Sequence, residues 1–261
     1  MEPIVSAPKS IHQQVVDGLG RRICGGEFQP GSFLPPEAAL CEQLQVSRVV
    51  VREAVKVLGA KGILEVRSKL GTRVLPVESW NTLDHQVMEW FMGGANRSKN
   101  LRDLMEFRRI IEPNATRLAV DRITEAQLET MSQAYAGMEA AVEAGDADAY
   151  VKADLRFHTT ILIAAGNIYL MNMRDAITNM MHQSFSISRR VAGAERLSLP
   201  LHYDLLMGLK RRDPVGAGNA IDRLITRAEQ NLEQWLLSAE RDSGEDGAAA
   251  GPLRLPGDER P

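Results

Sequence analysis

The sequence predicts a mainly α-helical protein: an N-terminal winged helix-turn-helix of three helices plus a small β hairpin, followed by an all-α helical bundle. Three observations lead to this fold class. Apolar residues recur at helical spacing through nearly all of the chain after residue 77. Before that point, three helical patterns are followed by two short β-like pieces. Aromatic residues make up only 5% of the chain, whereas Met is plentiful at 11, a composition that favours helices.

Shifts in composition divide the chain into four expected segments. Residues 10–76 should form the winged helix-turn-helix, residues 77–97 a linker with a connecting helix, and residues 98–240 the helical bundle. Residues 241–261 are rich in Gly, Pro and charged residues, so we expect a disordered tail there.

The first segment begins with helix signals and closes with a hairpin. Helical spacing across residues 10–25 ends at a pair of glycines, and Pro36 suits the first turn of the helix "EAALCEQL". Ser47 is a plausible N-cap for a third helix, "RVVVREAVKVLGAKG". The pieces "ILEV" and "TRVLP", joined by "RSKLG", then indicate a hairpin.

Downstream of the linker only helices are expected, separated by Gly, Asn and Asp-Pro breaks. Their approximate bounds are 84–93, 99–119, 124–143, 147–165, 168–189, 197–212 and 214–240.

Charge is distributed unevenly between the two parts. Residues 1–76 carry ten Lys or Arg against seven Asp or Glu, and the rest of the chain carries 21 against 27. The resulting charges of +3 and −6 indicate a first part that binds a polyanion and a second part with another role.

Composition also excludes several classes of protein. The two cysteines lack C-x-x-C spacing, which argues against a disulfide scaffold and a zinc ribbon. No apolar run reaches the ~18 residues that a membrane-spanning helix needs. The N-terminus also lacks a signal pattern. We therefore expect a cytoplasmic protein that does not contact a membrane.

The stretch "LCEQLQVSRVVVREAVKVL" has the pattern of a helix-turn-helix, with a short helix, a turn at Gln45 and a second helix opening at Ser47. Arg48 and Arg52 share one face of that second helix because they are four residues apart, whereas Val51, Val55 and Leu58 fill the opposite face. Arg is the side chain that binds guanine bidentately, and Ser47 is placed to meet a phosphate. Two arginines alone could equally form a solvated face; the helix-turn-helix context favours DNA.

The hairpin that follows is basic. Lys69 and Arg73 flank Gly71, and this wing could lie along the backbone or in the minor groove of DNA. A basic wing beside a recognition helix strengthens the assignment of residues 10–76 to DNA binding.

These motifs together resemble the winged helix of the GntR family of bacterial transcription regulators. The shared pattern is a Pro-Gly, a Leu-Pro followed by an acidic residue, Val-Ser-Arg, Arg-Glu-Ala and a Gly-Thr in the wing. The resemblance implies DNA binding through Arg48 and Arg52. One departure is Ala38, which stands where the family usually has a DNA-contacting Arg, so the operator sequence should differ.

The helical part places polar residues on stripes that should face its core. Asp154 and His158 lie four apart in "YVKADLRFHTTILIAAG", and His202 shares its stripe with leucines in "LPLHYDLLMGLK". Asp154 and His158 could simply hydrogen-bond each other. Arg108 shares its stripe with Leu101 and four other apolar residues, and a buried Arg requires an anion, either Glu112 one turn on or a bound ligand.

This part resembles the FCD domain of the FadR branch of the family, an all-helical domain that binds effectors and dimerises. The resemblance implies that Asp154, His158 and His202 hold a divalent metal ion, zinc or similar, and that Arg108 faces the carboxylate of the effector. The family's fourth ligand, a His, would align near Leu224, where none is present. A three-ligand site or a metal-free pocket are both open, with His182 a less favoured substitute.

The segment "ESWNTLDHQVMEWFMGG" and the missing fourth His resemble the sugar-acid regulators, in particular the galactonate-operon repressor group. This implies an aldonate effector. The hypothesis is a homodimeric repressor that binds a near-palindromic operator and is released by that effector. Two competing hypotheses are a regulator that responds to metal alone and a metal-dependent enzyme. The enzyme is less favoured because the motifs H-E-x-x-H and G-x-S-x-G and a phosphate-binding Gly loop are all lacking, so no catalytic residue is assigned.

Overall fold

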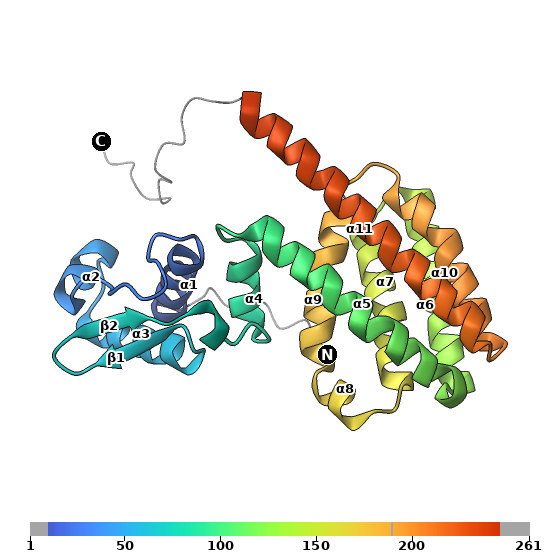
Figure 1. Ribbon diagram of the computed structural model, residues 1–261, viewed down its shortest axis with the longest axis horizontal. Helices are drawn as coiled ribbons and strands as arrows, with labels where there is room; N and C mark the ends of the chain where they lie inside the picture. The colour runs from blue at the N-terminus through green and yellow to red at the C-terminus, as the bar shows by residue number, and fades with distance from the viewer. Residues whose placement is uncertain (1–9, 189, 246–261) are drawn as a thin grey trace.

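The computed structural model describes residues 10–188 and 190–245, with side chains up to residue 238. Within these residues it contains eleven α-helices and one two-stranded sheet. Figure 1 shows two bodies, a small mixed one at the N-terminal end and a larger helical one, with α4 between them. The expected fold class, a winged helix-turn-helix followed by an all-α bundle, is confirmed.

The N-terminal body, here called the head, follows the expected order of elements. Its bounds are α1 (Ile11–Cys24), α2 (Glu37–Leu44), α3 (Arg48–Ala60), β1 (Leu64–Arg67) and β2 (Gly71–Val74). The strands pair antiparallel, with Leu64 opposite Val74 and Arg67 opposite Gly71.

The head has its own apolar core. The α3 residues expected to face inward, Val51, Val55 and Leu58, are all buried there, and Leu19 of α1 is fully enclosed. The turn between α2 and α3 depends on Gln45, whose backbone is left-handed with φ of 53°. Burying one stripe of α3 leaves the opposite stripe facing solvent, as a recognition helix requires.

A short connector joins the head to the helical body. It consists of the 3-10 turn η1 (Val77–Ser79) and helix α4 (His85–Met92), whose N-cap Asp84 accepts hydrogen bonds from the first turn. Trp90 of α4 packs in the core of the head, against Gly20 of α1, whereas Met88 packs in the core of the helical body. The connector is therefore a packed helix that contributes to two cores.

The helical body contains seven helices, most of them antiparallel neighbours in space (Figure 1). Their bounds are α5 (Arg97–Arg122), α6 (Glu125–Ala144), α7 (Ala147–Ala164), α8 (Ile168–Asn172), α9 (Arg174–Ser188), α10 (Ala194–Lys210) and α11 (Pro214–Glu245). Helix α7 packs against α5, α6 and α9, and α11 packs against α5, α9 and α10. Helices α5, α7, α9, α10 and α11 thus surround one interior region.

The prediction of a single helix over residues 168–189 is wrong, because the structure has two helices here, α8 and α9, separated at Met173. Asn167 accepts hydrogen bonds from the first turn of α8, and α8 buries none of its residues. Helix α9 buries a continuous stripe that begins at Ile177. Periodicity did not reveal the break because Met173 keeps a helix-like backbone, with φ of −92° and ψ of −1°.

The expected tail and the expected absence of a membrane-spanning helix can be compared with the structure only over the residues that it describes. The disordered tail was expected from residue 241, but α11 continues to Glu245, and residues 246–261 lie outside the described part of the chain. Among the described residues, no helix is both long enough and apolar enough to cross a membrane. Cys24 and Cys41 are both free thiols.

Candidate functional site

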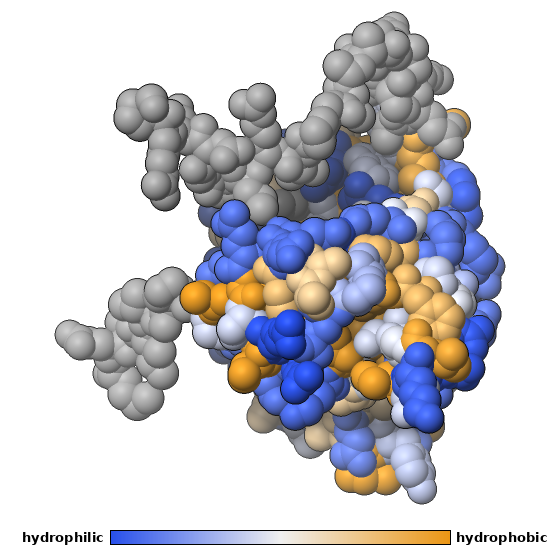
Figure 2. Space-filling view, turned by 90° about the vertical axis from the view of Figure 1, so that its left-hand side faces the viewer, coloured by the Kyte–Doolittle hydropathy of each residue, from blue (hydrophilic) through white to orange (hydrophobic). Residues whose placement is uncertain are grey.

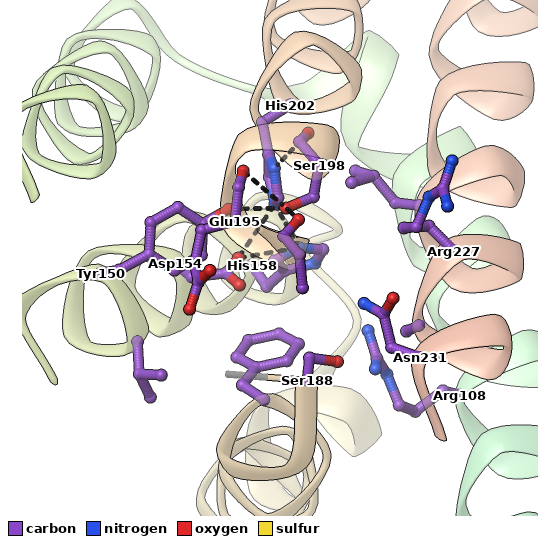
Figure 3. A pocket seen from close by; sticks show the side chains of 15 residues that line it. Arg108, Tyr150, Asp154, His158, Ser188, Glu195, Ser198, His202, Arg227 and Asn231 are labelled. Atoms are coloured by element: carbon purple, nitrogen blue, oxygen red, sulfur yellow. Dashed lines mark hydrogen bonds and ion pairs between the residues drawn. The ribbon is translucent and has the colours of Figure 1, made fainter. Parts of the chain in front are cut away.

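Asp154, His158 and His202 converge inside the helical body, as Figure 3 shows. Asp154 Oδ1 lies 3.0 Å from His202 Nε2 and 3.3 Å from His158 Nε2, and the two Nε2 atoms are 3.3 Å apart. All three side chains are buried. Helix α7 contributes the aspartate and the first histidine at i and i+4, and α10 contributes the second histidine from across the interior.

The outer nitrogen of each imidazole has a partner that fixes its tautomer. His202 Nδ1 lies 2.9 Å from the carbonyl oxygen of Ser198, to which it can only donate. His158 Nδ1 faces Glu112 Oε2 at 3.0 Å, an ion-pair contact, although this oxygen makes no well-aligned hydrogen bond among the described residues. We therefore assign the Nδ1-protonated tautomer to both rings, which leaves both Nε2 atoms with lone pairs.

This assignment leaves three lone-pair atoms facing one another: one carboxylate oxygen and two imidazole nitrogens. Such an arrangement requires either extra protons or a cation between the atoms. Metal–ligand bonds of about 2.0–2.1 Å separate neighbouring donors on a tetrahedral ion by about 3.3 Å, and the spacings of 3.0 and 3.3 Å agree with that value. The residues present fit a borderline divalent ion such as zinc.

Strong electrostatic coupling marks the same cluster. Burial lowers the pKa of His158, but the hydrogen bonds and charges of Asp154 and Glu112 outweigh burial and raise this pKa to about 9. Burial raises the pKa of Asp154, but His202 and His158 more than reverse this and hold it well below its usual range. In the absence of a metal ion, the imidazole of His158 is therefore protonated and positively charged at neutral pH.

Arg108 of α5 lies beside this cluster and already has an internal partner. Its Nε donates to Glu112 Oε1 at 2.5 Å and its Nη1 to Ser184 at 2.6 Å, while the guanidinium lies over the ring of Phe185 at 4.9 Å. The ion pair with Glu112, which the sequence left as an alternative to a bound ligand, is present. Glu112, held at a pKa of about 2 by Arg108 and His158 against the effect of burial, joins Arg108 to the histidines.

A pocket of about 460 Å³, part of it open to solvent, adjoins the cluster. Asp154, His158, His202 and Arg108 all line it. Leu224 of α11 lines it too, at the position where the family resemblance would place a fourth His.

His182, the less favoured substitute ligand, lies outside the cluster. It is exposed on α9, whereas the neighbouring Met181 is buried.

The polar lining residues that sequence reasoning missed include Arg227 and Asn231 of α11. Figure 3 shows them with Arg108 on the opposite side of the pocket from Asp154 and His158. They are four residues apart, so they share a face of α11. The signal that identified Arg108, a polar residue on an apolar stripe, was also present here, because Leu224 and Ala228 occupy the same face.

The proposed DNA-reading residues lie together at the N-terminal end of α3. Ser47 is the N-cap by position, but its side chain makes no capping hydrogen bond, so its hydroxyl is available to a phosphate. Arg48 is exposed and has no hydrogen bond or ion pair among the described residues. Arg52 is exposed as well, and its Nε donates to Glu37 at 2.8 Å, which holds the guanidinium beside α2.

The proposed wing residues lie at the tip and edge of the hairpin. Lys69 is exposed at the tip in a left-handed conformation with φ of 63°, and Gly71 begins β2 with φ of 109°, a value that favours glycine. Arg73 is half-buried and donates to the carbonyl of Gly31, so part of its hydrogen-bonding capacity is used within the head. Figure 2, which views the molecule from the head, shows hydrophilic surface interrupted by apolar patches, and Leu70 is among the exposed apolar residues.

A head with a solvent-facing recognition helix, joined to a helical body with an internal polar pocket, defines a DNA-binding transcription regulator that senses a small molecule. Comparison with known families agrees: residues 11–74 match the bacterial regulatory proteins of the gntR family, and residues 103–227 match the FCD domain. The chain belongs to the GntR family, in the group whose effector-binding part is an FCD domain, and it is not an enzyme.

Relatives cover almost the whole chain. It is 30% identical over 221 residues to the uncharacterized HTH-type transcriptional regulator YieP of Escherichia coli K12, a match spanning 85% of this chain and 95% of that protein. It is also 30% identical over 224 residues to the galactonate operon transcriptional repressor of the same organism, spanning 85% and 96%.

Solved structures support the fold. The structure of Lar, which controls expression of the Listeria monocytogenes agr system, superposes with a TM-score of 0.62 at 20% sequence identity, covering 88% of this chain and 99% of that one. At this level of identity the likeness concerns the fold alone.

Proposed function

We propose that this regulator is a homodimeric repressor of sugar-acid catabolism, released from a near-palindromic operator by an aldonate such as galactonate. The observation that carries the proposal is the internal pocket, in which Arg108 lies on one side and Asp154, His158 and His202 on the other. A sugar acid has one carboxylate and several hydroxyls, which such a polar interior can bind. The 30% identity to the galactonate operon repressor supports the same effector class.

The metal ion belongs to the same proposal. Asp154, His158 and His202 would hold it, and it would supply positive charge and Lewis acidity toward oxygen atoms of the effector. The carbonyl oxygen of Ser198 contacts Nδ1 of His202, and the carboxylate of Glu112 contacts Nδ1 of His158. These contacts orient both rings so that their Nε2 atoms face Asp154. With Leu224 in place of a fourth donor, the protein offers three ligands, and effector oxygens or water would complete the shell.

The release mechanism is a shift between two arrangements of the helical body. Helix α5 packs against α11 and directly follows α4, which is packed in the cores of both bodies. A change in packing around the pocket would therefore move the heads of a dimer relative to each other, and the spacing of their recognition helices would no longer fit two half-sites. Only an effector with different affinity for the two arrangements can cause this shift.

The effector assignment is tested by thermal shift and by release of the protein from DNA. Sugar acids, lactate, glycolate and acyl-CoA compounds are added to the metal-loaded protein on an operator duplex selected from random sequences. We expect aldonates to raise the melting temperature and to release the duplex. Stabilisation by acyl-CoA alone would exclude the sugar-acid proposal, and release by metal alone would favour a metal sensor.

A second candidate is a transcriptional activator, because the chain is 29% identical over 182 residues to the Glc operon transcriptional activator of Escherichia coli K12. A reporter gene downstream of the selected operator separates the two: deletion of a repressor raises expression, and deletion of an activator lowers it.

The DNA assignment predicts that Arg48→Ala and Arg52→Ala each weaken operator binding by roughly 5- to 150-fold, corresponding to about 1–3 kcal/mol for a base-reading arginine. The measurement is fluorescence anisotropy at fixed salt. Arg21→Ala is the matched control, because Arg21 is an exposed arginine of the head that pairs with Glu89 of α4. Unchanged operator affinity in both α3 variants would contradict the assignment.

A further inference from the structure

We infer that Arg227 and Asn231 of α11, rather than Arg108, bind the carboxylate of the effector, so that α11 is the helix that senses the ligand. This inference rests on the proposed function, since it assumes that a small organic acid enters the pocket. It identifies the part of the ligand that α11 recognises, an anionic end bearing two oxygen acceptors.

Most of the Arg108 guanidinium is already engaged inside the protein. Its charge is neutralised by Glu112 at 2.5 Å, and Ser184 accepts from a second nitrogen of the guanidinium. The face of the guanidinium is covered by Phe185, and the side chain is only 3% exposed. A ligand carboxylate bound through Nη1 and Nη2 would have to displace Ser184, and any shift of the guanidinium away from Glu112 would leave a buried charge without its partner.

Arg227 and Asn231 are in the opposite situation. Neither side chain has a hydrogen bond or an ion pair among the described residues, yet both line the pocket. Asn231 is only 5% exposed, and Arg227 is half-buried. The Asn231 amide can therefore donate into the pocket, and a guanidinium without a carboxylate offers its full bidentate edge. Free donors facing an internal pocket are what an anionic ligand requires.

The two side chains also suit one ligand geometrically. Residues four apart on a helix lie one turn from each other, so one carboxylate can be reached by both. The guanidinium can bind its two oxygens in parallel, and the amide NH₂ can donate to one of them or to the adjacent hydroxyl of a 2-hydroxy acid. The rest of the molecule would then extend toward Asp154 and the histidines across the pocket.

Helix α11 is also well connected to the rest of the molecule. Arg109 of α5 forms an ion pair with Glu229 of α11, and Arg102 of α5 forms another with Glu233, at 2.9 Å. Both acidic partners lie within two turns of the proposed ligand-binding pair. Each exposed ion pair contributes little energy. Because α11 also packs closely on α5, however, a movement of α11 would move α5 with it.

The test is isothermal titration of D-galactonate and D-gluconate into the metal-loaded, full-length protein, with galactitol as a neutral comparator. Arg227→Ala and the isosteric Asn231→Asp, which introduces a negative charge, should each weaken acid binding by roughly 10- to 100-fold, the range for a lost hydrogen bond to a charged group. The matched control is Arg223→Ala, because Arg223 lies one turn earlier on α11 and pairs with Asp204 at the surface.

A purely structural role for Arg227 predicts that Arg227→Ala melts at a lower temperature than the wild type even without ligand. The ligand-binding role predicts that the ligand-free melting temperature and the metal content of this variant equal those of the wild type, because the side chain has no ionic partner to lose among the described residues. Wild-type acid affinity in Arg227→Ala would overturn the inference while leaving the proposed function intact. Failure of the wild type to bind any acid would overturn both.

Discussion

Arg108→Met is expected to destabilise the protein by about 3–5 kcal/mol, the usual cost of removing one partner from a buried ion pair. The variant leaves Glu112 in the interior, 3% exposed, without the guanidinium that holds its pKa at about 2. Chemical denaturation monitored by circular dichroism measures the effect. Loss of effector response in this variant is therefore expected from loss of stability alone, without direct contact between Arg108 and the ligand.

The double variant Arg108→Met/Glu112→Gln provides the control. It removes both charges, and the amide keeps a polar group facing Nδ1 of His158. We expect it to be clearly more stable than the single variant, because no isolated charge remains in the interior. If the double variant is no more stable than the single one, the two side chains are not energetically coupled and the ion pair seen here does not stabilise the fold.

Metal binding should become tighter by about tenfold per pH unit between pH 7 and pH 9, and each ion bound at pH 7 should displace about one proton. The reason is His158, whose pKa is raised to about 9 by Asp154 and Glu112 although burial acts in the opposite direction. A metal ligand must be a neutral imidazole, so the proton competes with the ion. Chelator-competition titrations at several pH values, and calorimetry in two buffers of different ionisation enthalpy, measure both quantities.

The same pKa predicts how the metal-free protein behaves. The pKa of His158 in the folded state lies above the ordinary value of 6.5, so protonated His158 stabilises the fold fully below about pH 6.5. This contribution is lost as pH rises through about 9. The metal-free protein should therefore melt at lower temperature at pH 9.5 than at pH 7, and the metal-loaded protein should show a smaller change. A pH-independent metal affinity would contradict the assignment of His158 as a ligand.

Local signals in the sequence were sufficient for the fold class. The caps and breaks of the head determine its order of elements, and the α3 stripe of Val51, Val55 and Leu58 is buried as its spacing predicted. One helix break was missed, at Met173, because a single residue with a helix-like backbone does not disturb apolar periodicity. Periodicity reports which face is buried, but it does not report where a helix axis changes direction.

The candidate site was predictable in part. Inward polar residues identified Asp154, His158, His202 and Arg108, and the structure brings all four to one pocket. Sequence could not decide between Glu112 and a ligand as the partner of Arg108, because both satisfy the same charge. That choice depends on the side-chain conformation of Arg108, which the packing of α9 against α5 determines through Ser184 and Phe185.

Helix α4 has one further consequence, for how the protein unfolds. Because Trp90 is part of one core and Met88 of the other, melting either body uncovers apolar surface of this short helix and weakens the neighbouring body. We therefore expect denaturation in a single cooperative transition. A head fragment that ends before α4 would expose the α1 surface that Trp90 covers, so it should be prone to aggregate.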